Sequence, residues 1–199
     1  NGIPFAEYLT SLGIVPGIKV DKGAKKLPMC EGELITEGLD GLRERLAEYY
    51  ELGARFAKWR AVLSVADDKP SKTCIEVNAH ALARYSALCQ EAKIVPIVEP
   101  EVLMDGDHSI NKCYDVTAEV LDQVFTSLNE QRVSLNGIIL KPNMVISGAD
   151  ANDRADIVTV AGATVKCLTE HVPEEVPGIA FLSGGQTSEE ATAHLSAMN

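Results

Sequence analysis

Short apolar runs alternate with longer helical patterns along the whole chain, and this alternation restricts the folds open to it. The apolar runs cover residues 13–20, 54–63, 93–102, 136–142 and 177–185. Short runs bounded by Pro or Gly predict strands buried on both faces, as in parallel sheets. Helical patterns cover residues 38–52, 72–91, 111–131 and 152–171, and one more starts at a Thr187–Glu190 capping box. The alternation predicts an α/β fold with a parallel sheet.

Polar residues close each apolar run, at similar intervals. These are Lys19, then Lys58 with Arg60, Glu99 with Glu101, Lys141, and Ser183, and they recur every 39 to 42 residues. Such regular units are typical of a (β/α)8 TIM barrel, whose active site lies at the carboxyl ends of its strands. A doubly wound open sheet is the alternative, but its connections are less uniform and the chain has no Gly-rich first turn.

Five units are fewer than the eight of a closed barrel. We therefore expect residues 1–199 to be part of a single barrel domain, covering roughly strands 3 to 7. Such an arc would leave two sheet edges exposed, so we expect a longer chain.

Composition excludes several classes of protein. The net charge of −11 and the lack of a basic patch argue against nucleic acid as a partner. No apolar run reaches the ~18–20 residues of a membrane span. The five cysteines form no CxxC pair, which indicates neither a disulfide framework nor a thiolate zinc site. We expect a reducing compartment, the cytoplasm or an organelle stroma.

Lys141 closes the apolar run of IILKPNMV, where a buried strand should end. Burial and neighbouring cations favour a neutral amine, which can add to a carbonyl and form a Schiff base. The alternative is a lysine that snorkels to solvent or forms an ion pair.

Two neighbouring runs carry charged residues at a spacing of two. Lys58 and Arg60 share one side of their strand, and so do Glu99 and Glu101 on the next. The glutamates can pair with Lys58 and Lys141 and pass protons, and Pro100 between them predicts that this strand is ending. The alternative is a buried salt-bridge network without catalysis.

Two further features bear on ligands. Ser183, Gly184 and Gly185 lie between a strand and a capped helix, a junction that suits a phosphate group, although a simple turn would look the same. No metal site is predicted, because none of the four histidines ends a strand. An acidic protein can still bind an anionic substrate where its cations converge.

Eight segments together resemble class I fructose-bisphosphate aldolase. They are GIKVDKG (17–23), EGLDGL (37–42), FAKWR (56–60), NAHALARYSALCQ (78–90), IVPIVEPE (94–101), DGDH (105–108), LKPNMV (140–145) and FLSGGQ (181–186). The resemblance implies a barrel enzyme, usually a homotetramer, that needs no metal or other cofactor. It implies reversible cleavage of fructose 1,6-bisphosphate to dihydroxyacetone phosphate and glyceraldehyde 3-phosphate.

The resemblance also implies residue roles. Lys141 matches the Schiff-base lysine, Glu99 the acid/base glutamate, and Lys58 a lysine that assists proton transfer. Glu101 matches a carboxylate that positions these lysines. Lys19 and Arg60 match cations near the sugar hydroxyls and the C6 phosphate, and Ser183, Gly184 and Gly185 match the C1-phosphate loop.

The match departs from the family in three ways. The family's first-strand aspartate would lie before Asn1, and its last-strand arginine and terminal tyrosine would lie after Asn199. Residues 24–36 differ from the usual turn, which we interpret as surface variation. Two other functions stay open: a transaldolase-like Schiff-base lyase, and a non-catalytic scaffolding homologue.

Overall fold

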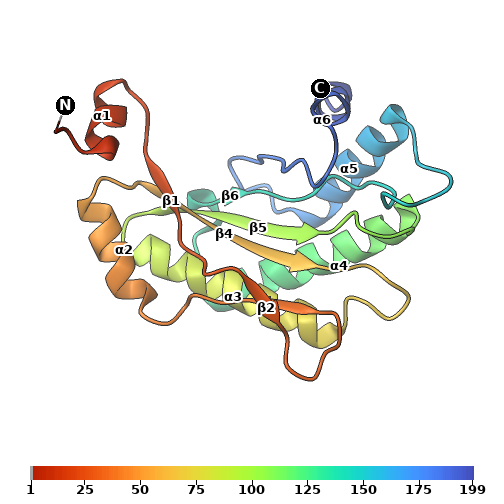
Figure 1. Ribbon diagram of the computed structural model, residues 1–199, viewed down its shortest axis with the longest axis horizontal. Coiled ribbons are helices and arrows are strands. Elements are labelled where there is room, and N and C mark those ends of the chain that lie inside the picture. The colour runs from red at the N-terminus through yellow and green to blue at the C-terminus, as the bar shows by residue number, and fades with distance from the viewer. Residues whose placement is uncertain (1) are drawn as a thin grey trace.

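A parallel sheet forms the centre of the computed structural model, which describes residues 2–199 (Figure 1). The sheet has the order β1-β4-β5-β6, and β2 pairs with β3 in a separate antiparallel hairpin. The strands are β1 (Gly17–Lys19), β2 (Ala24–Lys26), β3 (Leu34–Thr36), β4 (Phe56–Leu63), β5 (Val95–Val102) and β6 (Ile139–Leu140). The helices are α1 (Phe5–Ser11), α2 (Leu42–Glu51), α3 (Lys72–Glu91), α4 (Ile110–Glu130), α5 (Ile157–His171) and α6 (Ser188–Ala197), with a 3-10 turn, η1 (Leu135–Gly137).

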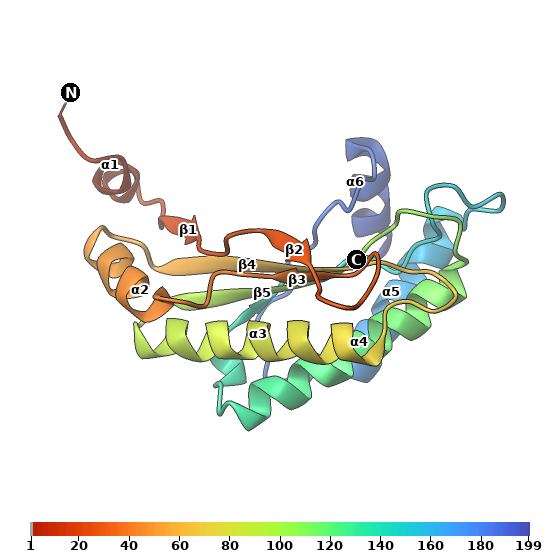
Figure 2. The ribbon, with the colours of Figure 1, turned by 60° about the horizontal axis from the view of Figure 1, so that its bottom comes forward.

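The helices that follow the strands cover one face of the sheet. Figure 2 shows α3 and α4 beneath β4 and β5, with α1 and α6 on the other side, near the two ends of the sheet. Trp59, Leu82 and Tyr85 fill the layer between α3 and the sheet, and none of them is exposed. A doubly wound sheet would carry helices on both faces and reverse its strand order. The one-sided cover and the sequential order are those of a barrel arc.

The predicted strands exist, but some are shorter than predicted. The runs at 54–63 and 93–102 become β4 and β5 with nearly the predicted bounds, whereas the run at 136–142 supplies only the two residues of β6. The run at 177–185 forms a single bridge, between Ile179 and Leu140. Backbone bonds from Leu140 N to Gly178 O (3.1 Å) and from Ala180 N to Leu140 O (2.9 Å) nevertheless hold it parallel to β6.

Strand β5 continues past Pro100 for two residues and ends at Val102, so the proline lies near the end of the strand but does not interrupt it. The reason is the direction in which the proline nitrogen points. Leu103 N donates to Leu63 O of β4 at 2.9 Å, so the odd-numbered nitrogens of this strand face β4. Pro100 N faces the opposite neighbour, β6, which has only two residues and pairs no further than Val98. No ladder bond is lost there.

Three elements were not predicted: helix α1, and the strands β2 and β3, which form a hairpin within residues 24–36. Three-residue strands are too short to show an alternating pattern. The hairpin packs on the barrel arc: Thr36 Oγ1 donates to Arg60 O at 2.7 Å, and Asn78 Nδ2 of α3 donates to Leu34 O at 2.8 Å.

Helix starts follow the predicted capping chemistry. The hydroxyl of Ser71 accepts from Cys74 N at the start of α3, and Thr187 with Glu190 forms the predicted capping box of α6. Within α5, Val160 and Ala161 are buried, but Ile157 and Val165 are 45% and 43% exposed.

Among residues 2–199, none of the helices combines the length and apolar character that a bilayer crossing requires.

The core layer under α3 generates a stability prediction. Replacing fully buried Leu82 with alanine removes packed methyl groups and leaves a cavity, so the Leu82→Ala variant should lose about 2–5 kcal/mol of unfolding free energy. The same change at Leu195, which is 44% exposed, should cost less than about 0.5 kcal/mol. Denaturant unfolding of the two variants measures the difference, and equal losses would contradict this assignment of the core.

Candidate active site

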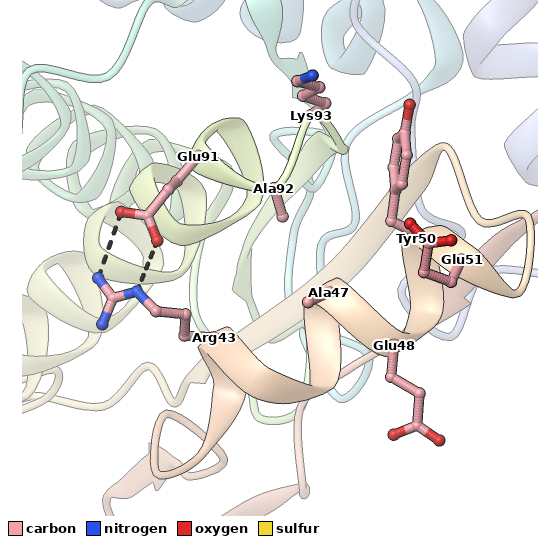
Figure 3. A pocket seen from close by; sticks show the side chains of 8 residues that line it. All are labelled: Arg43, Ala47, Glu48, Tyr50, Glu51, Glu91, Ala92 and Lys93. Carbon is pink, nitrogen blue, oxygen red and sulfur yellow. Dashed lines mark hydrogen bonds and ion pairs between the residues drawn. The ribbon is translucent and has the colours of Figure 1, made fainter.

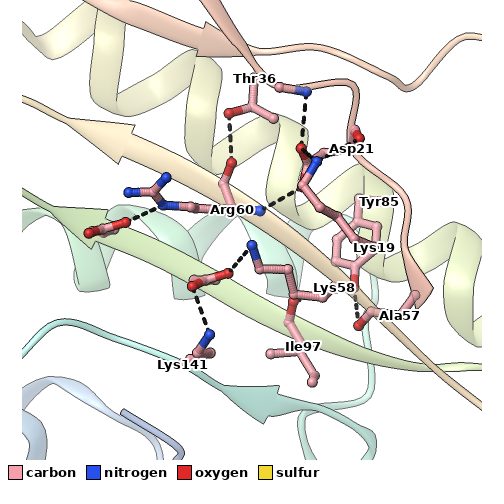
Figure 4. Close-up of polar contacts among 12 residues, drawn as sticks. Lys19, Asp21, Thr36, Ala57, Lys58, Arg60, Tyr85, Ile97 and Lys141 are labelled. Carbon is pink, nitrogen blue, oxygen red and sulfur yellow. Dashed lines mark hydrogen bonds and ion pairs between the residues drawn. The ribbon is translucent and has the colours of Figure 1, made fainter. Parts of the chain in front are cut away.

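Glu99 of β5 lies between the amines of Lys58, on β4, and Lys141, directly after β6. Figure 4 labels the two lysines. Its Oε2 is 2.7 Å from Lys58 Nζ, and its Oε1 is 3.0 Å from Lys141 Nζ. The Glu99 side chain is only 4% exposed, whereas the lysine side chains are 23% and 29% exposed. Oε2 has no hydrogen-bond partner among the described residues, so its contact with Lys58 is an ion pair without hydrogen-bond angles. One buried carboxylate therefore faces two amines that a ligand can reach.

Arg60 and Glu101 repeat this arrangement one step further along the same two strands. Arg60 Nε donates to Glu101 Oε2, and this hydrogen bond raises the pKa of Arg60 above its usual value. Glu101 pairs with Arg60, and no ion pair joins it to Lys58 or Lys141 among the described residues, so its role in positioning these lysines stays a prediction. Glu101 lies two residues, about 6.6 Å, further along β5 than Glu99, which brings its carboxylate within reach of the Arg60 side chain instead of the lysines.

Strand register explains both pairs. Lys58 pairs in the ladder with Ile97, and Arg60 pairs with Glu99. Each cation therefore reaches diagonally to the glutamate two positions further along β5 than its own ladder partner. The i, i+2 spacing seen in the sequence becomes two parallel ion pairs.

Lys19 at the end of β1 joins the site through Asp21, a residue that the sequence analysis missed. Lys19 Nζ contacts Asp21 Oδ1 and donates to Asp21 O at 3.0 Å. The second oxygen of this carboxylate, Oδ2, accepts from Arg60 N at 3.3 Å. Asp21 is 8% exposed and closes a strand like the other polar residues, which is the signal that could have identified it.

The Ser183–Gly185 turn lies beside the ion pairs. Gly184 and Gly185 have φ values of +61° and +91°, which favour glycine. A methyl group added at Gly184 would lie 4.0 Å from Glu101 Oε1, and one added at Gly185 would lie 3.1 Å from Met104 Sδ. The turn thus presents bare backbone close to the cluster.

Two buried side chains hold the strands that carry these groups, and the sequence analysis assigned neither a role. Asn143 Oδ1 accepts from Val102 N at 3.0 Å, and its Nδ2 donates to Thr117 Oγ1 at 3.0 Å. Tyr85 Oη of α3 donates to Ala57 O of β4 at 2.7 Å. This bond connects the helix to the strand at the residue directly before Lys58. These bonds fix the ends of the strands relative to one another.

The site has the components for carbonyl chemistry. One amine can add to a carbonyl, and the carboxylate in contact with it can move protons together with the second amine. Lys19, Arg60 and the bare turn offer cations and backbone donors to anionic groups on either side. Among residues 2–199, no cluster of three or more His, Cys, Asp or Glu side chains is arranged to hold a metal ion.

A hollow lies away from these residues, at the opposite end of the strands (Figure 3). It is lined by residues at the ends of α2 and α3, including Tyr50, Glu91 and Lys93. Arg43 and Glu91 form an exposed ion pair across it. None of the residues predicted to form the site contributes to it, because they lie at the carboxyl ends of the strands.

The fold and the site define an α/β protein whose lysines and carboxylates gather at the carboxyl ends of successive parallel strands. The family described as fructose-bisphosphate aldolase class-I matches residues 1–199. A protein of Xanthomonas axonopodis pv. citri named probable fructose-bisphosphate aldolase class 1 is 62% identical over all of this chain and 60% of its own length. Cytosolic fructose-bisphosphate aldolase 6 of Arabidopsis thaliana is 52% identical over all of this chain and 55% of its own.

One solved structure agrees with this assignment. Fructose-bisphosphate aldolase of Plasmodium falciparum, crystallised with TRAP and a small-molecule inhibitor, superposes with a TM-score of 0.96 at 48% identity. That match covers 99% of this chain and 57% of the aldolase. The chain therefore belongs to the class I fructose-bisphosphate aldolase family, and it spans 60% of the first of these relatives.

Two buried histidines near the site predict how stability changes with pH. Burial lowers the pKa of His108 and of His194 below the usual 6.5, although Asp107 and Glu190 respectively oppose this. Below pH 6.5 the unfolded chain therefore binds protons that the folded chain does not. The unfolding free energy should fall as the pH drops from 7 toward 5.

Urea unfolding at several pH values measures this slope. The double variant His108→Asn, His194→Asn should show a shallower loss on acidification than the unaltered protein. An identical slope in both proteins would show that these two histidines do not cause it.

Proposed function

We propose that the protein containing this chain is a class I fructose-bisphosphate aldolase. It would cleave fructose 1,6-bisphosphate reversibly to dihydroxyacetone phosphate and glyceraldehyde 3-phosphate. The observation that carries the proposal is the position of Lys141 Nζ, 3.0 Å from a buried carboxylate that also contacts Lys58. Family membership supplies the substrate, and the cations around the cluster suit its two phosphates.

The proposed reaction begins at Lys141. Its neutral amine adds to the C2 ketone and forms a carbinolamine: Glu99 accepts the proton that the amine loses, and the ammonium group of Lys58 donates a proton to the ketone oxygen, which becomes the hydroxyl. The protonated carboxyl then returns a proton to the departing hydroxyl, which leaves as water and produces an iminium ion. Lys58 contacts the same carboxylate and stabilises its charged form between these transfers.

The iminium ion makes the carbon–carbon bond breakable. A base removes the proton of the C4 hydroxyl, the C3–C4 electrons move into the iminium, and an aldehyde leaves an enamine on Lys141. Protonation at C3 and hydrolysis then release the ketone. In this scheme Lys19 and Arg60 neutralise the C6 phosphate, and Ser183 with Gly184 and Gly185 holds the C1 phosphate, so that remote binding energy orients the reacting carbons.

Several further properties belong to the proposal. Residues 1–199 would form part of one barrel domain in a homotetramer that uses no metal or other cofactor. A reducing compartment, the cytosol or an organelle stroma, suits the five free cysteines, four of which are buried within helices. The Arabidopsis relatives named cytosolic support the first of these compartments.

Trapping of the covalent intermediate tests the proposal. The full-length protein, incubated with dihydroxyacetone phosphate and borohydride, should gain one reduced adduct on Lys141 by peptide mass spectrometry. Lys141→Met should abolish the adduct and lower kcat by roughly 10³–10⁶-fold. Lys112→Met, outside the cluster, is the matched control. Labelling of Lys112, or no adduct in folded protein, would contradict the proposal and leave a binding role.

The C6-phosphate role of Arg60 distinguishes a bisphosphate aldolase from a transaldolase-like lyase. Arg60→Leu should raise the KM for fructose 1,6-bisphosphate about 10–100-fold, because charged hydrogen bonds to a phosphate are lost. The KM for fructose 1-phosphate should change less than about twofold, and Arg60→Lys should lie in between. Equal effects on both substrates, or a wild-type preference for the monophosphate, would favour the alternative lyase.

A further inference from the structure

Gln186 fixes the peptide unit at the centre of the Ser183–Gly185 turn. Its side-chain Nε2 donates to Ser183 O at 2.8 Å, and its backbone N donates to the same oxygen at 3.1 Å. The carbonyl of Ser183 and the N–H of Gly184 belong to one planar trans peptide, so the two bonds point in opposite directions. Holding the carbonyl toward Gln186 therefore sets the direction of the Gly184 N–H.

His194 of α6 in turn fixes the side chain of Gln186. Its Nδ1 lies 2.6 Å from Gln186 Oε1. The amide nitrogen is occupied as a donor to Ser183 O, so the amide oxygen must accept and Nδ1 must carry the proton. His194 and Gln186 are 4% and 8% exposed, so water cannot readily replace this contact.

We propose that Gln186 and His194 are positioning residues that hold the Ser183–Gly185 turn in the form that binds phosphate. The inference rests on the proposed function, which assigns the C1 phosphate to this turn. Gly184 and Gly185 both have positive φ and can adopt many conformations, so the turn does not fix its own peptide planes. The chain of contacts from α6 supplies that constraint.

The alternative is that His194 simply anchors α6 to the rest of the chain. Met198 separates the two explanations, because it lies on the same end of the chain and packs against the cluster of Met104, Met144, Ile146 and Val160. Its side chain supplies no hydrogen bond to Gln186 or to the turn among the described residues. Met198→Ala should loosen α6 without removing a hydrogen bond to the turn. His194→Leu and Gln186→Met remove the contacts, whereas His194→Asn keeps an N–H near the place of Nδ1.

Three measurements on the full-length variants test the inference: kcat and KM for fructose 1,6-bisphosphate, calorimetric binding of inorganic phosphate, and hydrogen exchange of the Gly184 and Gly185 amides. We expect His194→Leu and Gln186→Met to weaken substrate and phosphate binding about five- to tenfold and to speed amide exchange. His194→Asn should restore substrate and phosphate affinity to within about twofold of the unaltered protein. Met198→Ala should leave phosphate binding unchanged.

Other results would overturn the inference. Unchanged phosphate binding in His194→Leu and Gln186→Met, or an equal loss in Met198→Ala, would show that the contacts serve only to anchor α6. If the unaltered protein binds phosphate, the two variants lose that affinity, and no bisphosphate is cleaved, the proposed function fails and the positioning role stands. If it cleaves bisphosphate while the variants lose no affinity, the positioning role fails alone. If it binds no phosphate, both fail.

Discussion

A carboxylate that is almost out of contact with solvent, Glu99, lies between the amines of Lys58 and Lys141, and the rest of the site depends on that contact. A buried charge is expensive unless a partner of opposite charge offsets it, and here two partners share one acid. Neither lysine is fully buried, so a substrate can displace part of each ion pair. This combination suits proton transfer better than it suits a purely structural ion pair.

Strand geometry produces the site with few further requirements. Parallel strands in sequential order bring the ends of β1, β4, β5 and β6 to one edge, and residues two apart on one strand point to the same side. The diagonal pairs Lys58–Glu99 and Arg60–Glu101 follow from the β4–β5 register. Helices α3 and α4 take the opposite face of the sheet, which leaves the charged face open to a ligand.

Sequence alone predicted the larger features of the protein, because they follow from periodicity and from charge at strand ends. The α/β class, strands β4 and β5, and all nine site positions from Lys19 to Gly185 lie in segments that the pattern singled out. Their roles remain predictions. Capping chemistry also predicted the starts of α3 and α6, at Ser71 and Thr187.

Other features could not be predicted, for physical reasons. The β2–β3 hairpin has strands too short for a periodic signal, and the partner of Glu101 depends on register, which a sequence does not show. Asp21, Asn143 and Tyr85 act through contacts between residues far apart in the chain. The helix and strand propensities of single residues carry no information on such contacts.

The central claim is that the amine held against Glu99 is the group that captures a ketone. A crystal structure of the full-length protein soaked with dihydroxyacetone phosphate tests it most directly. The account predicts continuous density from Lys141 Nζ to the C2 carbon of the ligand, with the phosphate on the Ser183–Gly185 turn. A covalent bond to a different lysine, or a phosphate bound away from this turn, would contradict it.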